Sequence, residues 1–341
     1  MSDTIKAVLI GWDGAVLQRP LPEVGAAATA LRIVPAVLPS LLDLQQLGLR
    51  LVLLGTGPAA ERSGASAGFV QQLCASQGLL TESLEPDHAL SVQQALTKYL
   101  QESSCQPAEI ALVTTHPQAL AAARALGMRA CFFSTRDSDG SGWPALVEEL
   151  TARKSTIERT TRETRITGHI NLDTTAPIAI TTGIGFFDHM LEQLAKHGGF
   201  SLQLSCTGDL QIDEHHTVED CALALGDGLK RALGAKLGIG RYGFLLAMDE
   251  AEAQVAIDLS GRAYCLFEGK FTRESVGGLP TELVSHFYRS LADSLGAAIH
   301  VTVRGENAHH MIEASFKGVG RALRQALRRQ GNDLPTTKGS L

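Results

Sequence analysis

The chain has 341 residues, of which 44% are hydrophobic and 19% charged, a composition typical of a folded protein with room for two domains. Its net charge of −6 gives no electrostatic reason to bind nucleic acid or an anionic membrane, and no apolar run approaches the roughly 20 residues that span a bilayer. The six cysteines form no Cys-x-x-Cys pair and the first residues lack signal-peptide features, so we expect reduced thiols in a cytoplasmic protein.

The first half of the chain alternates short apolar strands with amphipathic helices. Strands are predicted at 5–10, 49–54, 110–113 and 128–133, and helices at 37–46, 92–101 and 117–126. This alternation predicts an α/β domain, residues 1–152, on a doubly wound parallel sheet. Ligands bind such sheets at the carboxyl ends of the strands, where Asp13, Thr56 and Thr114 stand.

A polar segment at 151–165 separates this half from a second one, and we place the domain boundary near 152–157. Beyond it the chain repeats itself. A shift of 97 positions places His189 on His286, and after each of these helical stretches comes an alternating strand, a polar turn and a long amphipathic helix. We therefore predict an α+β domain made of a duplicated strand-and-helix unit.

The signature His-His-x-x-Glu occurs once in each copy of this unit, at 215–219 and at 309–313. On a helix the Glu lies one turn beyond both His, so it can share a face with either imidazole. Adjacent positions differ by about 100° around a helix, so the two imidazoles of a pair diverge and serve different ions. Together with the aligned His189 and His286, the two signatures predict a two-metal centre.

The donor set restricts the metal and the kind of site. Imidazole nitrogens without thiolates suit manganese, iron, nickel or zinc, and match calcium or magnesium poorly. Four protein ligands per ion leave open positions in an octahedral shell, which favours catalysis over a closed structural site. The alternative is a metal-binding or storage module, which would lack a phosphate-binding set of cationic side chains.

Further segments carry a resemblance to one enzyme family. They read Phe-Asp-His-Met-Leu, Asp-Glu-Ala, Asp-Leu-Ser-Gly-Arg and Leu-Pro-Thr-Thr-Lys-Gly, at 187–191, 249–251, 258–262 and 334–339. With these segments and the two signatures, residues 157–341 resemble imidazoleglycerol-phosphate dehydratase, an enzyme of histidine biosynthesis. The resemblance implies a hydro-lyase that converts D-erythro-imidazole glycerol phosphate into imidazole acetol phosphate.

The resemblance also implies a cofactor, an assembly and residue roles. It implies two Mn²⁺ ions per active site, in a 24-subunit homo-oligomer whose sites lie between copies. Removing a proton from an unactivated carbon needs a positioned base, which would be Glu163. One ion would bind His215, Glu219, His286 and His309, and the other His189, His216, His310 and Glu313. The substrate would contact Gln193, His197, Arg241, Arg262, Lys317, Thr336 and Lys338.

The first half resembles the haloacid-dehalogenase-like phosphatases, specifically a histidinol-phosphate phosphatase domain, but with altered motifs. The family opens with Asp-x-Asp-Gly-Thr, whereas this chain has Gly11 at the position of the nucleophilic Asp and retains only Asp13-Gly14. The family's phosphate-binding Lys corresponds to 85–86, Glu-Pro, and its magnesium-binding acids to 114–115, Thr-Thr. A phosphoaspartate mechanism needs these carboxylates, so we predict an inactive domain. A bifunctional enzyme with a live phosphatase is the alternative.

Overall fold

The computed structural model describes residues 5–18, 32–57, 64–84, 91–134, 142–331, 333–336 and 338. The chain divides into two compact units, Met1–Thr151 and Ala152–Leu341. Each unit has its own hydrophobic core. The polar segment predicted to hold the boundary starts the second unit, because residues 154–160 form a strand whose Ser155 and Ile157 are buried while Lys154 and Glu158 face solvent.

The first unit is built on a parallel sheet of five strands in the order β5-β4-β1-β6-β7. The strands are β1 (Ala7–Gly11), β4 (Arg50–Leu54), β5 (Thr81–Leu84), β6 (Ile110–Thr114) and β7 (Arg129–Phe132). Every residue of β1 is buried, as expected for a central strand covered on both faces. The chain order reverses between β4 and β6, so the carboxyl end of β1 is the switch point where doubly wound sheets bind ligands.

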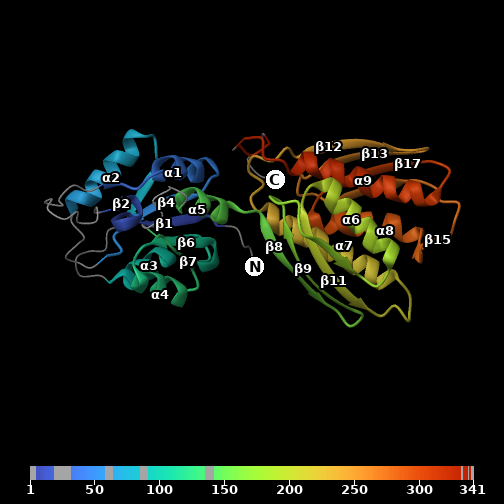
Figure 1. The fold of residues 1–341 in the computed structure, drawn as a ribbon, viewed down its shortest axis with the longest axis horizontal. Coiled ribbons are helices and arrows are strands. Elements are labelled where there is room, and N and C mark those ends of the chain that lie inside the picture. Colours follow the sequence, from blue (N-terminus) through green and yellow to red (C-terminus); the bar gives the residue numbers. More distant parts are fainter. Residues whose placement is uncertain are drawn as a thin grey trace, which may run out of the picture. The chain divides into compact units, whose positions relative to one another are not determined.

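Helices cover both faces of this sheet, as Figure 1 shows. Residues of α1, α2 and α5 pack with Val8 and Ile10 of β1, and residues of α3 and α4 pack with Ala7 and Leu9. The helices are α1 (Val37–Gln46), α2 (Gly64–Ser76), α3 (Val92–Glu102), α4 (Pro117–Ala125) and α5 (Gly142–Thr151). Short elements complete the described part: η1 (Trp12–Val16), η2 (Pro107–Glu109), and the paired β2 (Leu17–Gln18) and β3 (Arg32–Ile33).

The second unit has two halves with the same order of elements. The first comprises β8 (Lys154–Thr160), β9 (Thr164–Asn171), β10 (Ile178–Thr181), α6 (Gly185–Gly198), β11 (Ser201–Gly208) and α7 (His215–Leu233). The second comprises β12 (Tyr242–Met248), β13 (Ala251–Asp258), β14 (Tyr264–Glu268), α8 (Glu282–Leu295), β17 (Ala298–Arg304) and α9 (Ala308–Leu327), with a small hairpin, β15 (Ser275–Val276) and β16 (Leu279–Pro280), before α8.

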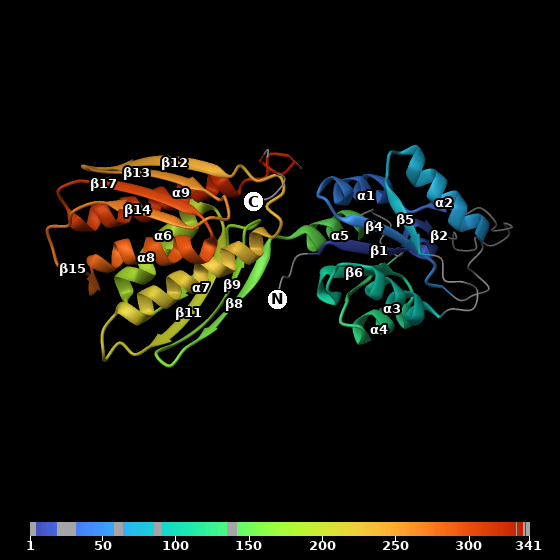
Figure 2. The ribbon, with the colours of Figure 1, turned by 180° about the vertical axis from the view of Figure 1, so that it is seen from behind.

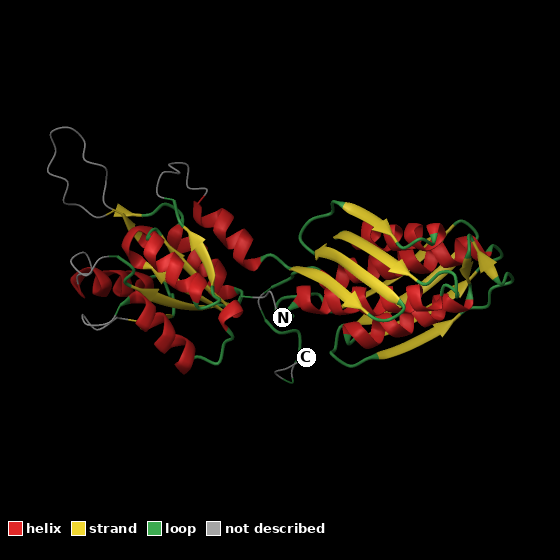
Figure 3. Ribbon diagram, turned by 90° about the horizontal axis from the view of Figure 1, so that it is seen from below, coloured by secondary structure: helices red, strands yellow, loops and turns green. Residues whose placement is uncertain are grey.

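The two halves also share their strand order. The sheets run β10-β11-β9-β8 and β14-β17-β13-β12, and in each the first pair is parallel and the other pairs are antiparallel. Each sheet is covered by the helices of its own half, and α6 packs on α9 while α7 packs on α8. The helices therefore lie between two outer sheets, as the opposite views of Figures 1 and 2 and the view from below in Figure 3 show.

Both helix pairs meet at a glycine. A Cβ on Gly226 of α7 would lie 2.9 Å from the carbonyl oxygen of Leu291 on α8, and one on Gly320 of α9 would lie 2.6 Å from that of Leu194 on α6. Only glycine permits such close approach of two helix backbones. These crossings bring the first turns of α7 and α9, which carry the two signatures, beside His286 of α8 and His189 of α6.

Candidate active site

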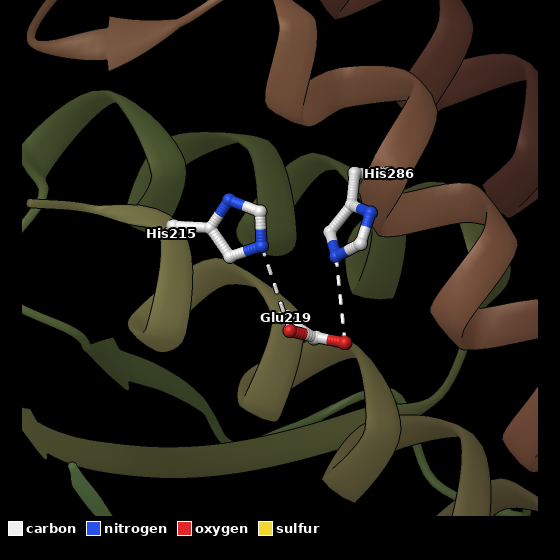
Figure 4. Close-up of side chains that lie close together, drawn as sticks. All are labelled: His215, Glu219 and His286. Carbon is white, nitrogen blue, oxygen red and sulfur yellow. Dashed lines mark ion pairs between the residues drawn. The ribbon is translucent and has the colours of Figure 1, made fainter.

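The first signature forms a three-residue cluster with α8. His215 and Glu219 lie one turn apart on α7, with His215 Nε2 3.6 Å from Glu219 Oε2. His286 of α8 approaches from the other side, its Nε2 3.5 Å from Glu219 Oε1 (Figure 4). One ligand atom from each residue lies within 4.8 Å of the others, which suits a single metal ion. The buried His286 Nε2 has no hydrogen-bond partner among the described residues, which leaves this nitrogen available to a cation.

The second signature repeats this arrangement with α6. His309 Nε2 lies 3.5 Å from Glu313 Oε2, and His189 Nε2 lies 3.7 Å from Glu313 Oε1. The resemblance assigned His309 to the ion of the first cluster, whereas within one chain this side chain lies beside Glu313. Lys317, one turn further along α9, places its Nζ 2.9 Å from Glu313 Oε1.

The second histidine of each signature turns away from its own cluster. The rings of His215 and His216 are inclined by 79°, and those of His309 and His310 by 87°, which agrees with the predicted divergence. Hydrogen bonding to the carboxylate of Asp209 raises the pKa of His216. Hydrogen bonding to Glu250 raises that of His310 in the same way.

Glu163, the predicted base, lies exposed in the turn between β8 and β9. Asp220, the neighbour of the metal-ligand candidate Glu219, anchors this hairpin: it accepts hydrogen bonds from the hydroxyls of Thr161 and Thr164 and pairs with Arg159 at 2.7 Å. Burial of Asp220 raises its pKa, but the hydrogen bonds from Thr164 and Arg159 outweigh burial, so the pKa lies below its usual value. The backbone carbonyl of Glu163 accepts from the N–H of Asp209 at 3.1 Å, and the carboxylate of Asp209 binds His216, so this hydrogen-bond chain links the predicted base to the histidine.

A separate cavity of about 1140 Å³ gathers cationic side chains at the other end of α7. It includes the predicted phosphate contacts Arg241, Arg262, Thr336 and Lys338, and two lysines that sequence reasoning missed, Lys230 and Lys236. Arg262 is exposed and, within the described part of the chain, makes no ion pair. An open cavity with several cationic forks and ammonium groups is suited to a phosphate ester.

Two cations of this cavity are fixed by neighbouring groups. Arg241 binds both oxygens of Asp258, at 2.6 and 3.1 Å, and donates to the carbonyl of Pro335, so it ties the carboxyl-terminal tail to the cavity. The hydrogen bond to Asp258 raises the pKa of Arg241. Lys236 is buried and donates to the carbonyl of Leu259, and burial together with nearby Lys230 lowers its pKa.

The remaining predicted substrate contacts lie apart from this cavity. Gln193 and His197 are on α6, one and two turns beyond His189, and Lys317 is on α9 beside Glu313. Burial, followed by the charges of Lys317 and Arg321, lowers the pKa of His197. One chain therefore places Arg241, Arg262, Thr336 and Lys338 together, and groups Gln193, His197 and Lys317 with the metal-ligand candidates.

The switch point of the first unit holds Asp13 in a closed hydrogen-bond network. Its Oδ1 accepts from the backbone N–H and the hydroxyl of Thr56, both at 2.9 Å, and its Oδ2 accepts from the N–H of Gly57 and lies 3.3 Å from His116 Nε2. The Thr56 and Thr114 hydroxyls are 2.7 Å apart. Residues 85–86, where the family's Lys was expected, lie outside the described residues.

Comparison with known proteins identifies the family. Residues 182–323 match the family model of imidazoleglycerol-phosphate dehydratase. The chain is 42% identical to the histidine biosynthesis bifunctional protein HisB of Xylella fastidiosa (strain 9a5c), over 98% of this chain and 99% of that protein. The chain belongs to the imidazoleglycerol-phosphate dehydratase family. The HisB protein of Stenotrophomonas maltophilia (strain K279a) is similar at 43% identity, again over 98% of this chain and 99% of its own length.

Membership makes the chain a hydro-lyase of histidine biosynthesis, as the motifs of the second half predicted. Solved imidazoleglycerol-phosphate dehydratase structures are also similar: that from Staphylococcus aureus subsp. aureus N315, at 36% identity and a TM-score of 0.47, covers 52% of this chain and 99% of its own. That from Pyrococcus furiosus, at 35% and 0.47, covers 54% and 100%. Among the described residues, no helix is both long and apolar enough to span a membrane.

Proposed function

We propose that this chain converts D-erythro-imidazole glycerol phosphate into imidazole acetol phosphate at a centre of two Mn²⁺ ions. The observation that carries the proposal is the pairing of two His–Glu–His clusters with a cationic cavity in a member of this family. A metal-storage module would need the clusters alone. The cationic lining, which includes Arg262 and Lys338, suits a ligand that also carries a phosphate.

The residues present fit a pair of divalent transition-metal ions. Each cluster offers two imidazole nitrogens and a carboxylate, and a second histidine stands next to each cluster in the chain. This donor set suits manganese and leaves positions open for substrate. When bound, the ions supply Lewis-acid polarisation of the substrate's imidazole and of its departing hydroxyl.

The protein itself supplies the base and the orientation. We propose that Glu163 takes the carbon-bound proton onto its carboxylate. Its backbone is hydrogen-bonded to Asp209, the partner of His216, and its side chain makes no hydrogen bond or ion pair with any residue that the structure describes. A base for this step has to lie close to the imidazole ring of the substrate and be free to accept a proton. The cationic cavity would hold the phosphate and so fix the carbon chain between base and ions.

The metal-ligand candidates and the cavity are too far apart to serve one substrate within one chain. His215 starts α7, whereas Gly234, directly after its last residue, lines the cavity. At 1.5 Å per residue these positions are separated by about 28 Å. The imidazole and phosphate of the substrate are joined by a chain of a few bonds of about 1.5 Å each, a span of less than roughly 10 Å. We therefore propose that the metal end of one copy and the cavity of another form each active site.

This arrangement requires a homo-oligomer, and the 24-subunit shell stays a prediction from the family resemblance. It also gives a role to the residues that lie apart from the cavity. Lys317, His197 and Gln193 of one copy would meet, at the metal end, a substrate whose phosphate lies in the cavity of the next. We further infer that the unit arose by duplication, since both halves share strand order and a glycine at equivalent helix crossings.

We propose that the first unit is haloacid-dehalogenase-like in fold and inactive as a phosphatase. A Cβ on Gly11 would lie 2.5 Å from Thr56 Oγ1 and 3.0 Å from Thr114 Oγ1, so hydroxyls fill the space of the missing nucleophile. Asp13 is already saturated by hydrogen bonds from Thr56 and Gly57. The HisB relatives are named bifunctional proteins, which favours the alternative. Magnesium-dependent hydrolysis of histidinol phosphate by the purified chain would decide for that alternative.

A matched pair of variants tests the proposed centre. Glu219→Gln keeps the shape of a ligand but removes its charge, so we expect turnover of imidazole glycerol phosphate to fall at least 100-fold and Mn²⁺ binding to weaken. Glu158→Gln makes the same change at an exposed position of β8, a strand that carries no metal-ligand candidate, and should leave both unchanged. Normal turnover by Glu219→Gln would refute the assignment of this cluster.

A further inference from the structure

The two His-His-x-x-Glu signatures are held by the same local interactions at their first histidine. The backbone N–H of His215 donates to Asp213 Oδ1 at 2.7 Å, and that of His309 donates to Asn307 Oδ1 at 2.9 Å. These side chains satisfy N–H groups at the start of α7 and α9, which no intrahelical carbonyl can reach. The first histidine of each pair then faces the Glu of its own helix through Nε2.

The second histidine of each pair is held through its ring. His216 Nδ1 lies 3.2 and 3.1 Å from the two carboxylate oxygens of Asp209, and His310 Nδ1 lies 3.2 and 2.9 Å from those of Glu250. A carboxylate can only accept a hydrogen bond, so Nδ1 carries the proton in both rings. Nε2, on the far side of each ring from the carboxylate, is then left with the free lone pair.

We propose that Asp209 and Glu250 are positioning residues of the metal centre. Each fixes one histidine as the tautomer that binds metal through Nε2 and sets the direction of its ring. A metal-bound histidine normally donates its other ring N–H to a carboxylate or carbonyl in this way, and removing such a partner typically weakens metal binding about 10- to 100-fold. The inference rests on the proposed two-metal centre, to which it adds residues outside the predicted ligand set.

The comparison of the two halves separates this role from that of a base. Glu163 directly precedes β9 and Glu250 directly precedes β13, so they occupy equivalent hairpin turns. Glu250 is committed: besides His310 it accepts from the N–H of Asn307, the residue before α9. In the first half Asp209 takes the histidine, and the Glu163 carboxylate makes no hydrogen bond within the described part of the chain. Glu163 therefore remains the candidate base, and Glu250 is a positioning residue.

The test is a titration of the chelator-stripped full chain with Mn²⁺. Binding is measured as the loss of the electron paramagnetic resonance signal of free Mn²⁺. The family resemblance implies that His216 and His310 bind the same ion. Asp209→Ala and Glu250→Ala should therefore each lower the affinity for one of the two ions per chain about 10- to 100-fold and leave the other unchanged. The amide variants Asp209→Asn and Glu250→Gln keep an acceptor oxygen and should recover most of the affinity. The control Glu252→Ala removes an exposed carboxylate of β13 that accepts a hydrogen bond from Gln254, and should leave the affinity for Mn²⁺ unchanged.

The outcomes separate the two proposals. If the unmodified chain fails to bind two ions, the proposed centre fails. Suppose that the unmodified chain binds two ions and that Glu250→Ala has the circular dichroism spectrum of a folded protein. If this variant then binds both ions with unchanged affinity, the positioning role is wrong. Lost turnover with unchanged Mn²⁺ affinity would also overturn it, since that result would place Glu250 on the substrate. Should the alanine variants not fold, an amide variant that binds as weakly as a variant lacking His310 would contradict the proposal.

Discussion

Asp220 links the metal helix α7 to the hairpin that carries the predicted base. Its carboxylate is buried and accepts hydrogen bonds from Thr161, Thr164 and Arg159, which lie at the end of β8 and the start of β9. Replacing Asp220 by alanine would remove the hydrogen bonds that tie the hairpin turn to α7 and leave the buried Thr164 hydroxyl without its acceptor. We predict a loss of stability in the second unit and a loss of turnover together.

The magnitude follows from the groups involved. Hydrogen bonds from the hydroxyls of Thr161 and Thr164 to a carboxylate contribute about 1.5 kcal/mol each at the low end of their range. The Arg159 side chain is 36% exposed, so its pair with Asp220 adds less than about 1 kcal/mol. Asp220→Ala should therefore cost about 3 to 4 kcal/mol, or roughly 10 °C in Tm for a unit of this size. Asp220→Asn keeps one acceptor oxygen and should cost about half as much.

The two tryptophans of the chain allow a clean assay. Trp12 and Trp143 both lie in the first unit, so tryptophan fluorescence follows only that unit, whereas circular dichroism follows both. The variants should lower the Tm of the second unit, which only circular dichroism detects, and leave the Tm detected by fluorescence unchanged. Samples are compared at equal protein concentration because assembly contributes to stability. A cost below about 1 kcal/mol for Asp220→Ala, or an equal shift of both transitions, would refute the reasoning.

Three further predictions concern other parts of the molecule. Arg262→Ala should raise the KM for imidazole glycerol phosphate at least tenfold in steady-state assays, while Mn²⁺ affinity is unchanged because the cavity is remote from the ligands. Gly11→Asp should not create histidinol phosphate hydrolysis, because Thr56 and Thr114 hydroxyls fill that space, and hydrolysis above background would contradict this. Hydrogen bonding to Lys6 lowers the pKa of Glu109 in the folded chain. The ion pair therefore contributes to stability above the unfolded pKa of about 4.3, and this contribution is lost as the pH falls through the folded pKa. Tryptophan-detected unfolding of Glu109→Gln should therefore differ from the parent at pH 7 and converge with it in acid.

Local patterns predicted the parts of the site that depend on neighbouring residues in the chain. The spacing of the two signatures and the alignment of His189 with His286 predicted a two-metal centre, and the family resemblance grouped His286 with Glu219, beside which it lies. The long amphipathic helices predicted after each polar turn are α7 and α9, which begin at His215 and Ala308 and so include the two signatures. Their first turns are polar, so apolar periodicity there is weak, and caps mark the starts instead.

Contacts between segments that are distant in the chain could not be predicted from the sequence. Lys236 enters the cavity through a backbone with φ of 59° and a hydrogen bond to the carbonyl of Leu259, neither of which has a periodic signal. Glu250 reaches His310 across 60 positions of the chain, and its role shows only when the β12–β13 turn is set against α9. The distance between the metal end and the cavity likewise depends on the full length of α7. A signal was available for Glu250, which belongs to the Asp-Glu-Ala segment of the family resemblance.

In the proposed assembly each active site combines the metal end of one copy with the cavity of another. Co-expression of Glu219→Gln and Arg262→Ala chains under separate tags, followed by assay of the doubly purified assemblies, tests it directly. Each variant alone should show almost no turnover at low substrate concentration. Mixed assemblies should recover up to roughly a quarter of the parental activity, because some sites then pair an intact metal end with an intact cavity. Mixed assemblies that bind Mn²⁺ yet stay as inactive as the separate variants would show that each chain works alone and that the active site is not shared between copies.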